Sequence, residues 1–138
     1  MIAEIVQNIT DADIFALQTE KIYPADYSQT VNVAKNEFSS NELPALVKLP
    51  NIDAYDKIIL IYPLWWSDLP KPVENFLRNI DLSGKKLYPI VTHGGGGLEN
   101  SIETLKNYTL AEISEPLDIY SSDILSSRKI ILDWLKKE

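Results

Sequence analysis

Residues 58–67 read Ile-Ile-Leu-Ile-Tyr-Pro-Leu-Trp-Trp-Ser, and this stretch decides the fold of the chain. The unbroken apolar run that opens it predicts a strand buried on both faces, the kind found in parallel sheets. Pro63 ends the run, and Trp65 and Trp66 then put a large aromatic surface where the chain leaves the sheet. Ligands of open α/β sheets bind in the crevice at the carboxyl ends of the strands, so this exit is a candidate site.

A second apolar run, Leu87 to Thr92, ends in the loop His93-Gly94-Gly95-Gly96-Gly97. Glycine lets a backbone approach a ligand closely and adopts positive φ without steric cost. The loop differs from the dinucleotide fingerprint, which needs spaced glycines and a later acidic residue, and from a P-loop, which needs a lysine. A flexible turn before the next helix is the alternative interpretation. For the tryptophan loop, the alternative is that both indoles pack on neighbouring helices.

Helices and strands alternate along the rest of the chain. The apolar spacing predicts helices at 2–9, 27–39, 70–79, 101–108 and 124–137, and further strands at 13–17 and 117–120. Asn100 and Glu103 have the spacing of a capping box at the start of one helix. This alternation predicts a single α/β domain, residues 1–138, in which helices cover both faces of a parallel sheet.

Composition excludes several function classes. The net charge of −7 and the absence of a basic patch argue against a nucleic-acid partner. The chain has no cysteine and one histidine, which excludes thiol chemistry and argues against His-based metal sites and a Ser-His-Asp triad. No apolar run is long enough for a membrane span, and no signal peptide is visible. We therefore expect no metal, no assigned catalytic residue, no membrane association and a cytoplasmic location.

Taken together, the two loops resemble those of the flavodoxin family, especially its short bacterial branch. In that branch a Tyr-Pro-x-Trp-Trp loop and a Thr-His-Gly-Gly-x-Gly loop hold the flavin ring, and the matching residues here are Tyr62 to Ser67 and Thr92 to Gly97. The resemblance extends over nearly the whole chain, through Asp13–Phe15, Tyr23–Tyr27, Pro70–Phe76 and Asp81–Lys85. It implies an α/β fold, a flavodoxin-like three-layer sandwich with a parallel sheet.

The resemblance also implies a function and a site. The function would be electron transfer or oxidoreduction by an FMN-binding protein, with a redox protein or a small-molecule electron donor or acceptor as its partner. The two tryptophans would flank the isoalloxazine ring, while backbone N–H groups of both loops would reach the ring edge, its pyrimidine end or the ribityl chain. The cofactor-binding residues would be Pro63, Leu64, Trp65, Trp66, Ser67, Thr92, His93, Gly94, Gly95 and Gly96.

One part of the family pattern has no counterpart in this sequence. Family members begin with a central strand and a Ser/Thr- and Gly-containing loop around the FMN phosphate, whereas this chain begins inside the family's first helix, so the resemblance implies an N-terminally truncated domain. Hydrogen bonds to charged groups contribute about 1.5–3 kcal/mol each, so the loss of several weakens binding by orders of magnitude. Three hypotheses follow: an FMN protein of reduced affinity, a non-catalytic binding or structural domain, and a homodimer in which a neighbouring subunit supplies the strand.

Overall fold

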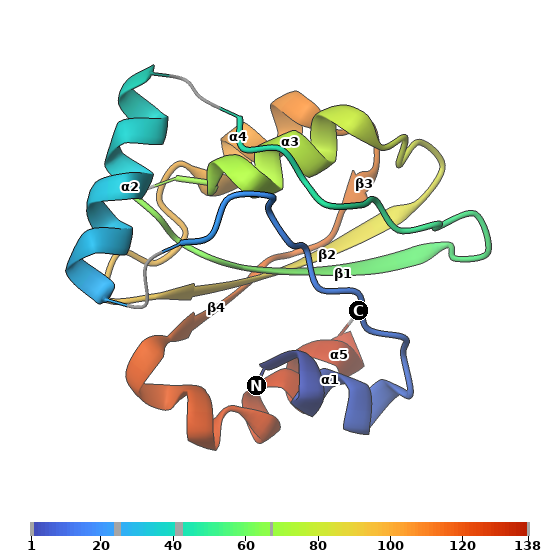
Figure 1. The fold of residues 1–138 in the computed structure, drawn as a ribbon. Coiled ribbons are helices and arrows are strands. Elements are labelled where there is room, and N and C mark those ends of the chain that lie inside the picture. Colours follow the sequence, from blue (N-terminus) through green and yellow to red (C-terminus); the bar gives the residue numbers. More distant parts are fainter. Residues whose placement is uncertain (1, 24–25, 41–42, 67, 138) are drawn as a thin grey trace.

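The computed structural model describes residues 2–23, 26–40, 43–66 and 68–137 (Figure 1). Five α-helices, four strands and one 3₁₀ helix follow one another in these ranges: α1 (Ile2–Thr10), α2 (Tyr27–Ser40), β1 (Lys57–Pro63), α3 (Lys71–Asn79), β2 (Lys86–His93), α4 (Ser101–Tyr108), β3 (Glu112–Ile113), β4 (Leu117–Tyr120), η1 (Ser121–Ser126) and α5 (Arg128–Lys137). Helices α3 and α4 cover one face of the sheet and α1 and α5 the other, while α2 stands beyond the carboxyl ends of the strands (Figure 1).

Every strand pair in the sheet is parallel. Strand β1 pairs with β2 along its whole length, from Lys57↔Lys86 to Pro63↔Thr92. The other side of β2 pairs with β3 near its amino end and with β4 near its carboxyl end. Within the described residues, β2 therefore has neighbours on both sides, whereas β1 pairs only with β2 and forms an edge.

The register fixes which backbone groups of β1 face its free edge. The N–H of Leu64 donates to the carbonyl of Thr92, and the N–H of Lys86 donates to the carbonyl of Asp56. Backbone groups of successive residues point to opposite edges of a strand, so the even-numbered residues of β1 face β2 and Ile59 and Ile61 face outward. Pro63 also faces outward, and its missing N–H therefore costs no bond to β2.

The strands bury both faces, as their unbroken apolar sequences predict. On one face a core forms beneath α3 and α4, and it includes Leu60, Tyr62, Val73, Phe76, Leu87, Val91 and Leu105. On the other face a second core forms against α1 and α5, and it includes Ile2, Val6, Tyr88, Ile90, Ile119, Ile131 and Trp134. The alternation of side chains along β2 places Leu87 and Tyr88 in different cores, which is the pattern of a strand between two helical layers.

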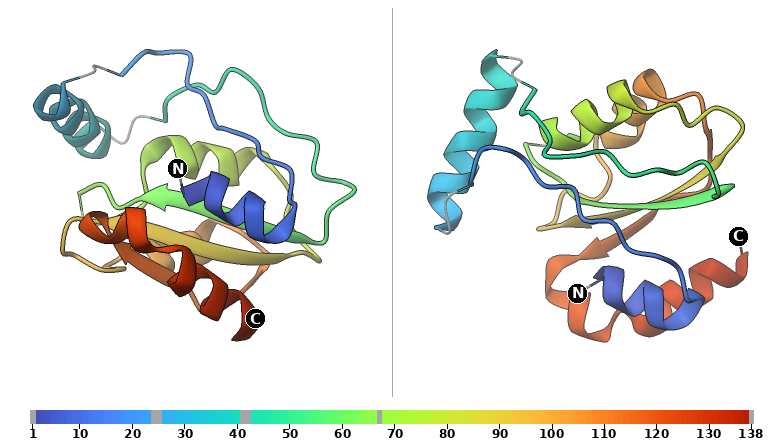
Figure 2. Two further views of the ribbon diagram at one scale, coloured as in Figure 1. Left: turned by 90° about the horizontal axis from the view of Figure 1, so that it is seen from below. Right: turned by 45° about the vertical axis from the view of Figure 1, so that its right-hand side comes forward.

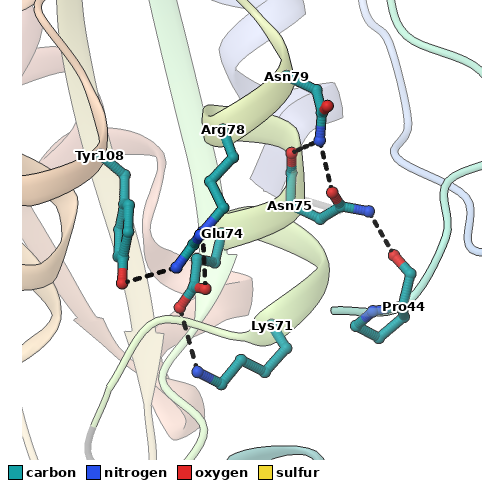
Figure 3. Close-up of polar contacts among 7 residues, drawn as sticks. All are labelled: Pro44, Lys71, Glu74, Asn75, Arg78, Asn79 and Tyr108. Atoms are coloured by element: carbon teal, nitrogen blue, oxygen red, sulfur yellow. Dashed lines mark hydrogen bonds and ion pairs between the residues drawn. The ribbon is translucent and has the colours of Figure 1, made fainter. Parts of the chain in front are cut away.

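A polar network anchors α3 to its neighbours (Figure 3). Buried Glu74 accepts bonds from Lys71 Nζ and Arg78 Nε, each at 3.1 Å, and Arg78 Nη2 reaches the hydroxyl of Tyr108 on α4 at 3.2 Å. A buried carboxylate is stable only when it is paired and hydrogen-bonded, as it is here. The network fixes one wall of the space beside β1.

Most of the predicted elements are confirmed. Strand β4 and helix α4 have the predicted bounds, and α1, α2, α3, β1 and β2 differ from them by one or a few residues at their ends. The predicted final helix divides into η1 and α5, and the two-residue strand β3 was not predicted. None of the described helices is long and apolar enough to cross a membrane.

Two local predictions are wrong. Residues 13–17 do not form a strand, because the groove separates them from the free edge of β1, and Ile14 and Phe15 remain 45% and 41% exposed. The chain instead passes from α1 over the outer edge of β1 toward α2 (Figure 2). Asn100 does not act as a side-chain cap, because its backbone is helical, with φ −86° and ψ −5°, rather than in the extended conformation that a cap requires.

Candidate functional site

A groove of about 1370 Å³ runs along the free edge of β1. Its floor is β1 itself, one wall comes from α1, a second from Val73 and Phe76 of α3, and residues 12–17 lie opposite the strand. At the carboxyl end of β1 the mouth of the groove is lined by Tyr23, Pro63 and Trp65, together with Thr92. The aromatic exit predicted from the sequence therefore borders this groove.

The tryptophan loop is a tight turn. Trp65 and Asp68 exchange backbone hydrogen bonds of 3.0 and 3.1 Å, so the chain reverses between them. Trp66 occupies the turn with φ +52°, a left-handed conformation that is uncommon for residues other than glycine. Ser67, a predicted cofactor-binding residue, lies outside the described residues.

Helix α2 and the segment before it support both tryptophans. The Trp65 ring packs on Tyr23, with centroids 5.6 Å apart, and the Tyr23 hydroxyl donates to the carboxylate of Glu37 at 2.7 Å. Glu37 is only 1% exposed and also pairs with Lys21. Trp66 turns the other way, is 46% exposed, and donates its indole N–H to the carbonyl of Val31 at 2.9 Å. One tryptophan thus borders the groove and the other fastens the turn to α2.

The glycine loop is organised by His93. The N–H of Gly95 donates to His93 Nδ1 at 3.0 Å, so Nε2 carries the proton and donates to Asp118 Oδ2 at 2.9 Å. The ring also meets Tyr120 edge-on, at 5.6 Å between centroids. Both ring nitrogens are therefore bonded within the protein, and His93 is a positioning residue. Nowhere in the described ranges do three His, Cys, Asp or Glu side chains form a cluster that could hold a metal ion.

Two of the four loop glycines have backbone conformations that favour glycine, and a third is closely surrounded. Gly95 and Gly97 have φ of +131° and +68°. A Cβ on Gly96 would lie 3.0 Å from the side chains of both Leu64 and Glu99, so a larger residue there requires these side chains to shift. A Cβ on Gly94 would meet nothing within 4 Å, and its φ lies outside the left-handed region. Gly94 is exposed, and it keeps an open approach to the loop.

The two loops are joined to each other and to α4. Leu64 N–H donates to the Thr92 carbonyl at 2.8 Å, which extends the β1–β2 pairing into the site. The hydroxyl of Tyr62, at the end of β1, donates to Ser101 Oγ at 3.0 Å. Burial, opposed by the Ser101 hydrogen bond, raises the pKa of Tyr62 to about 12, so this phenol stays neutral and keeps α4 against the strand.

The predicted site residues thus separate into groups. Pro63, Leu64, Trp65, Thr92 and Gly96 come together at the mouth of the groove and where the loops touch. The ring of His93 points toward β4, and the indole of Trp66 points toward α2. Within this structure the N–H groups of Leu64, Trp65 and Gly95 are bonded inside the protein, and ligand binding by the backbone of both loops stays a prediction.

Four supporting residues were not predicted from the sequence as site residues: Tyr23, Glu37, Asp118 and Tyr120. Tyr23 lies in a loop that shares the family resemblance without a role assigned to it, and Glu37 lies on a helix face that reads as polar, so no local pattern marks either as a support of the site. Asp118 and Tyr120 lie on the strand next to β2, opposite Val91 and His93. The sequence offers one indication for Asp118: it is a polar residue near the carboxyl end of a predicted parallel strand, where ligands of such sheets bind.

Comparison with known proteins places the chain in a family. A family model for flavodoxin matches residues 1–137. A protein assigned as a flavoprotein from Bacteroides uniformis is 26% identical with a TM-score of 0.84, and the match covers 98% of this chain and 88% of that one. Its counterpart from Bacteroides eggerthii is 25% identical with a TM-score of 0.83, covering 98% of this chain and 86% of that one. A Lactobacillus acidophilus flavoprotein solved in complex with FMN is 18% identical, with a TM-score of 0.64 over 92% of this chain and 87% of that one, and this likeness concerns the fold. No curated protein matches the chain significantly.

Proposed function

We propose a function from one premise: the chain belongs to the flavodoxin family. It binds FMN at the carboxyl edge of the sheet, with the flavin ring at the mouth formed by Pro63, Trp65 and Thr92, and it serves in electron transfer or as part of an oxidoreductase. The observation that carries the proposal is that a groove of about 1370 Å³ opens at this mouth, where β1 and β2 end.

The residues at the mouth fit the ring of a flavin. Trp65 and Tyr23 offer two adjacent aromatic rings inclined by 59°, and stacking of a planar ligand on one such ring contributes about 0.5–1.5 kcal/mol beyond area burial. A Cβ on Gly94 would meet nothing within 4 Å, so the space beside this glycine is open and a planar ligand can approach the backbone there. Thr92 borders the groove and supplies a hydroxyl and a backbone at the floor of the site.

The protein's contribution to the chemistry is positioning and environment. Bound FMN supplies the redox chemistry, and the surrounding groups tune it. Trp65 and Tyr23 exclude water from one side of the mouth, and the His93–Asp118 pair holds the glycine loop in a fixed shape. The net charge of −7 disfavours any gain of negative charge at the site and so lowers the reduction potential. It also suits docking of a basic redox partner.

Titration of the purified protein with FMN tests this proposal. We expect flavin absorbance after mixing and desalting, and saturable quenching of flavin fluorescence. Trp65→Ala weakens the affinity about tenfold, because it removes the stacking surface. The matched control is Leu110→Ala, since this side chain is 83% exposed and lies between α4 and β3, at the amino end of the sheet. A protein that stays colourless, or equal affinity in both variants, contradicts the proposal.

A second function, a binding or structural domain without a cofactor, is favoured by one observation. The N–H groups of Leu64, Trp65 and Gly95 are satisfied within the protein, so the loops hold their shape without a ligand. Such a domain gives no saturable signal with FMN, yet Trp65→Ala still lowers its stability, because the contact with Tyr23 is lost. The titration and the unfolding curve of the same variant therefore separate the two functions.

A further inference from the structure

We propose that Asp118 is a positioning residue that acts through His93 to decide which backbone N–H groups the glycine loop offers to a ligand. Asp118 holds the imidazole ring of His93, and the ring holds the N–H of Gly95. The N–H groups of Gly94 and Gly96 are left for the ligand. The ligand's identity as FMN rests on the proposed function, whereas the contacts from Asp118 to Gly95 can be measured without any ligand.

The pairing of β4 with β2 brings Asp118 beside His93. Ile119 packs in the core against α1 and α5, so Asp118 and Tyr120 project from β4 to the other face of the sheet. His93 lies on that same face, because it follows Val91 of the α3–α4 core by two residues. The His93 side chain is 7% exposed and the Asp118 side chain 51%. A mostly buried imidazole is thus tied to a carboxylate at the surface.

The directions of the hydrogen bonds at His93 are fixed by the groups that make them. A backbone N–H can only donate, so His93 Nδ1, which lies 3.0 Å from the Gly95 nitrogen, is the acceptor. Nε2 then carries the proton and donates it to Asp118 Oδ2 at 2.9 Å. A half-turn of the ring about its Cβ–Cγ bond puts carbon atoms at both positions and breaks both bonds. Asp118 therefore holds the ring in the orientation that Gly95 needs.

The contact with Tyr120 cannot replace this anchor. The two rings meet edge-on, with centroids 5.6 Å apart and planes inclined by 88°. Such a contact restrains the position of the imidazole, but it depends on ring shape much more than on which ring atoms are nitrogen. Within the described residues, the only hydrogen bond that fixes the orientation of the ring from β4 is the one to Asp118.

The bond to His93 divides the N–H groups of the glycine loop into two kinds. The Gly95 N–H is directed back to the ring, and Gly95 has a φ of +131°, which glycine adopts without steric cost. The N–H groups of Gly94 and Gly96 donate to no described residue, and both glycines are exposed. Two open donors beside a fixed one suit a ligand whose edge carries hydrogen-bond acceptors. The carbonyl oxygens of a flavin ring form such an edge.

Spectra of the protein without ligand give the first test, because the chain has one histidine. In ¹⁵N-labelled protein, we expect ring signals from a protonated Nε2 and an unprotonated Nδ1. Asp118→Ala speeds hydrogen exchange at the Gly95 amide at least about tenfold, because the ring is no longer held. Asp118→Asn keeps a side-chain carbonyl for Nε2–H, so exchange stays within about twofold of the wild type. The matched control is Asp123→Ala, which removes an exposed carboxylate on η1 and leaves the exchange unchanged.

A double-mutant cycle tests whether Asp118 acts through His93. His93→Asn removes the ring but supplies a side-chain carbonyl that can accept from the N–H two residues later, as in an Asx turn. In the His93 background, Asp118→Ala weakens FMN binding about tenfold. In the His93→Asn background, the same substitution changes the affinity by less than about twofold, because the link to Gly95 no longer passes through a ring.

Three results overturn the proposal: an unchanged Gly95 amide in Asp118→Ala, equal losses of FMN affinity in the two backgrounds, and an FMN-induced shift of the Gly95 amide larger than the shifts of Gly94 and Gly96. The expected result is a saturable shift of the Gly94 and Gly96 amides with the Gly95 amide in place. A protein that gives no saturable signal with FMN contradicts the proposed function, and the exchange rates and ring signals of the unliganded variants then decide the role of Asp118 alone.

Discussion

Strands β1 and β2 are similar in sequence and parallel in register, yet they occupy different environments. Ile61 and Ile90 are direct partners across the pair. Ile90 has neighbours on both sides and is 0% exposed, whereas Ile61 borders the groove and is only partly buried.

The loops that follow the two strands differ in the same way. The His93 loop is fixed by its own neighbour β4, while the Trp65 loop depends on α2 and Tyr23. The loop after β2, which has strands on both sides, is therefore supported by the sheet, whereas the loop after β1, which has a strand on one side, is supported by a helix and a loop.

The largest expected effect compares the two isoleucines. Ile90→Ala lowers the free energy of unfolding by about 3–4 kcal/mol, because it leaves a cavity in a fully packed core. Ile61→Ala lowers it by about 1–2 kcal/mol, since this side chain already borders open space. Urea unfolding followed by circular dichroism measures both values. Equal losses would show that β1 is as well packed as β2.

A pH titration tests the burial of Tyr62 at the end of β1. Its pKa is raised from 10.0 to about 12, so the folded protein favours the neutral phenol. The stability that this provides is complete below pH 10 and is lost as pH rises from 10 through 12, by about 2–3 kcal/mol. Tyr62→Phe has no phenol to ionise, so the difference between the two unfolding free energies changes over this range. A constant difference would mean that Tyr62 is accessible to water.

Two glycines of the His93 loop sharpen the comparison of the loops. Gly96→Ala forces a Cβ against Leu64 at 3.0 Å and lowers the unfolding free energy by about 1–3 kcal/mol. Gly94→Ala meets nothing and changes it by less than about 0.5 kcal/mol. Gly94→Ala nevertheless weakens FMN binding, because the new methyl group occupies the open approach. Unfolding curves and FMN titrations of both variants check this, and the reverse order of stabilities would contradict the described loop.

The smallest expected effect is the difference in stability lost when each of two indole hydrogen bonds is removed. Trp134 donates to the carbonyl of Glu115 from a buried position, and Trp66 donates to the carbonyl of Val31 from an exposed one. Trp134→Phe removes a part-buried hydrogen bond and leaves the Glu115 carbonyl with the 3.4 Å bond from Ser114 Oγ, so it costs about 1–1.5 kcal/mol, whereas Trp66→Phe costs about 0.5 kcal/mol because water replaces the bond. Thermal unfolding of the two variants, with the wild type beside them, measures the difference.

The sequence predicts the strands and helices well where local pattern determines them. The apolar runs before Pro63 and His93 can only be strands in a domain of this kind, and both are observed. Residues 13–17 have a similar composition, but a strand forms only beside a free edge within reach, and sequence does not reveal where that edge lies. The supports of the site depend on distant contacts for the same reason. Tyr23 meets Trp65, and His93 meets Asp118, only after the sheet has formed.

The central claim is that the carboxyl edge of β1 and β2 binds the flavin ring. Three tryptophans give three indole N–H signals in a ¹⁵N–¹H correlation spectrum of the labelled protein. On addition of FMN, we predict that the Trp65 indole and the Gly94 amide shift in a saturable way, while the Trp134 indole, which packs with the α1–α5 core on the opposite face, stays in place. Unchanged Trp65 and Gly94 signals at saturating FMN, or shifts confined to Trp134, would contradict the account.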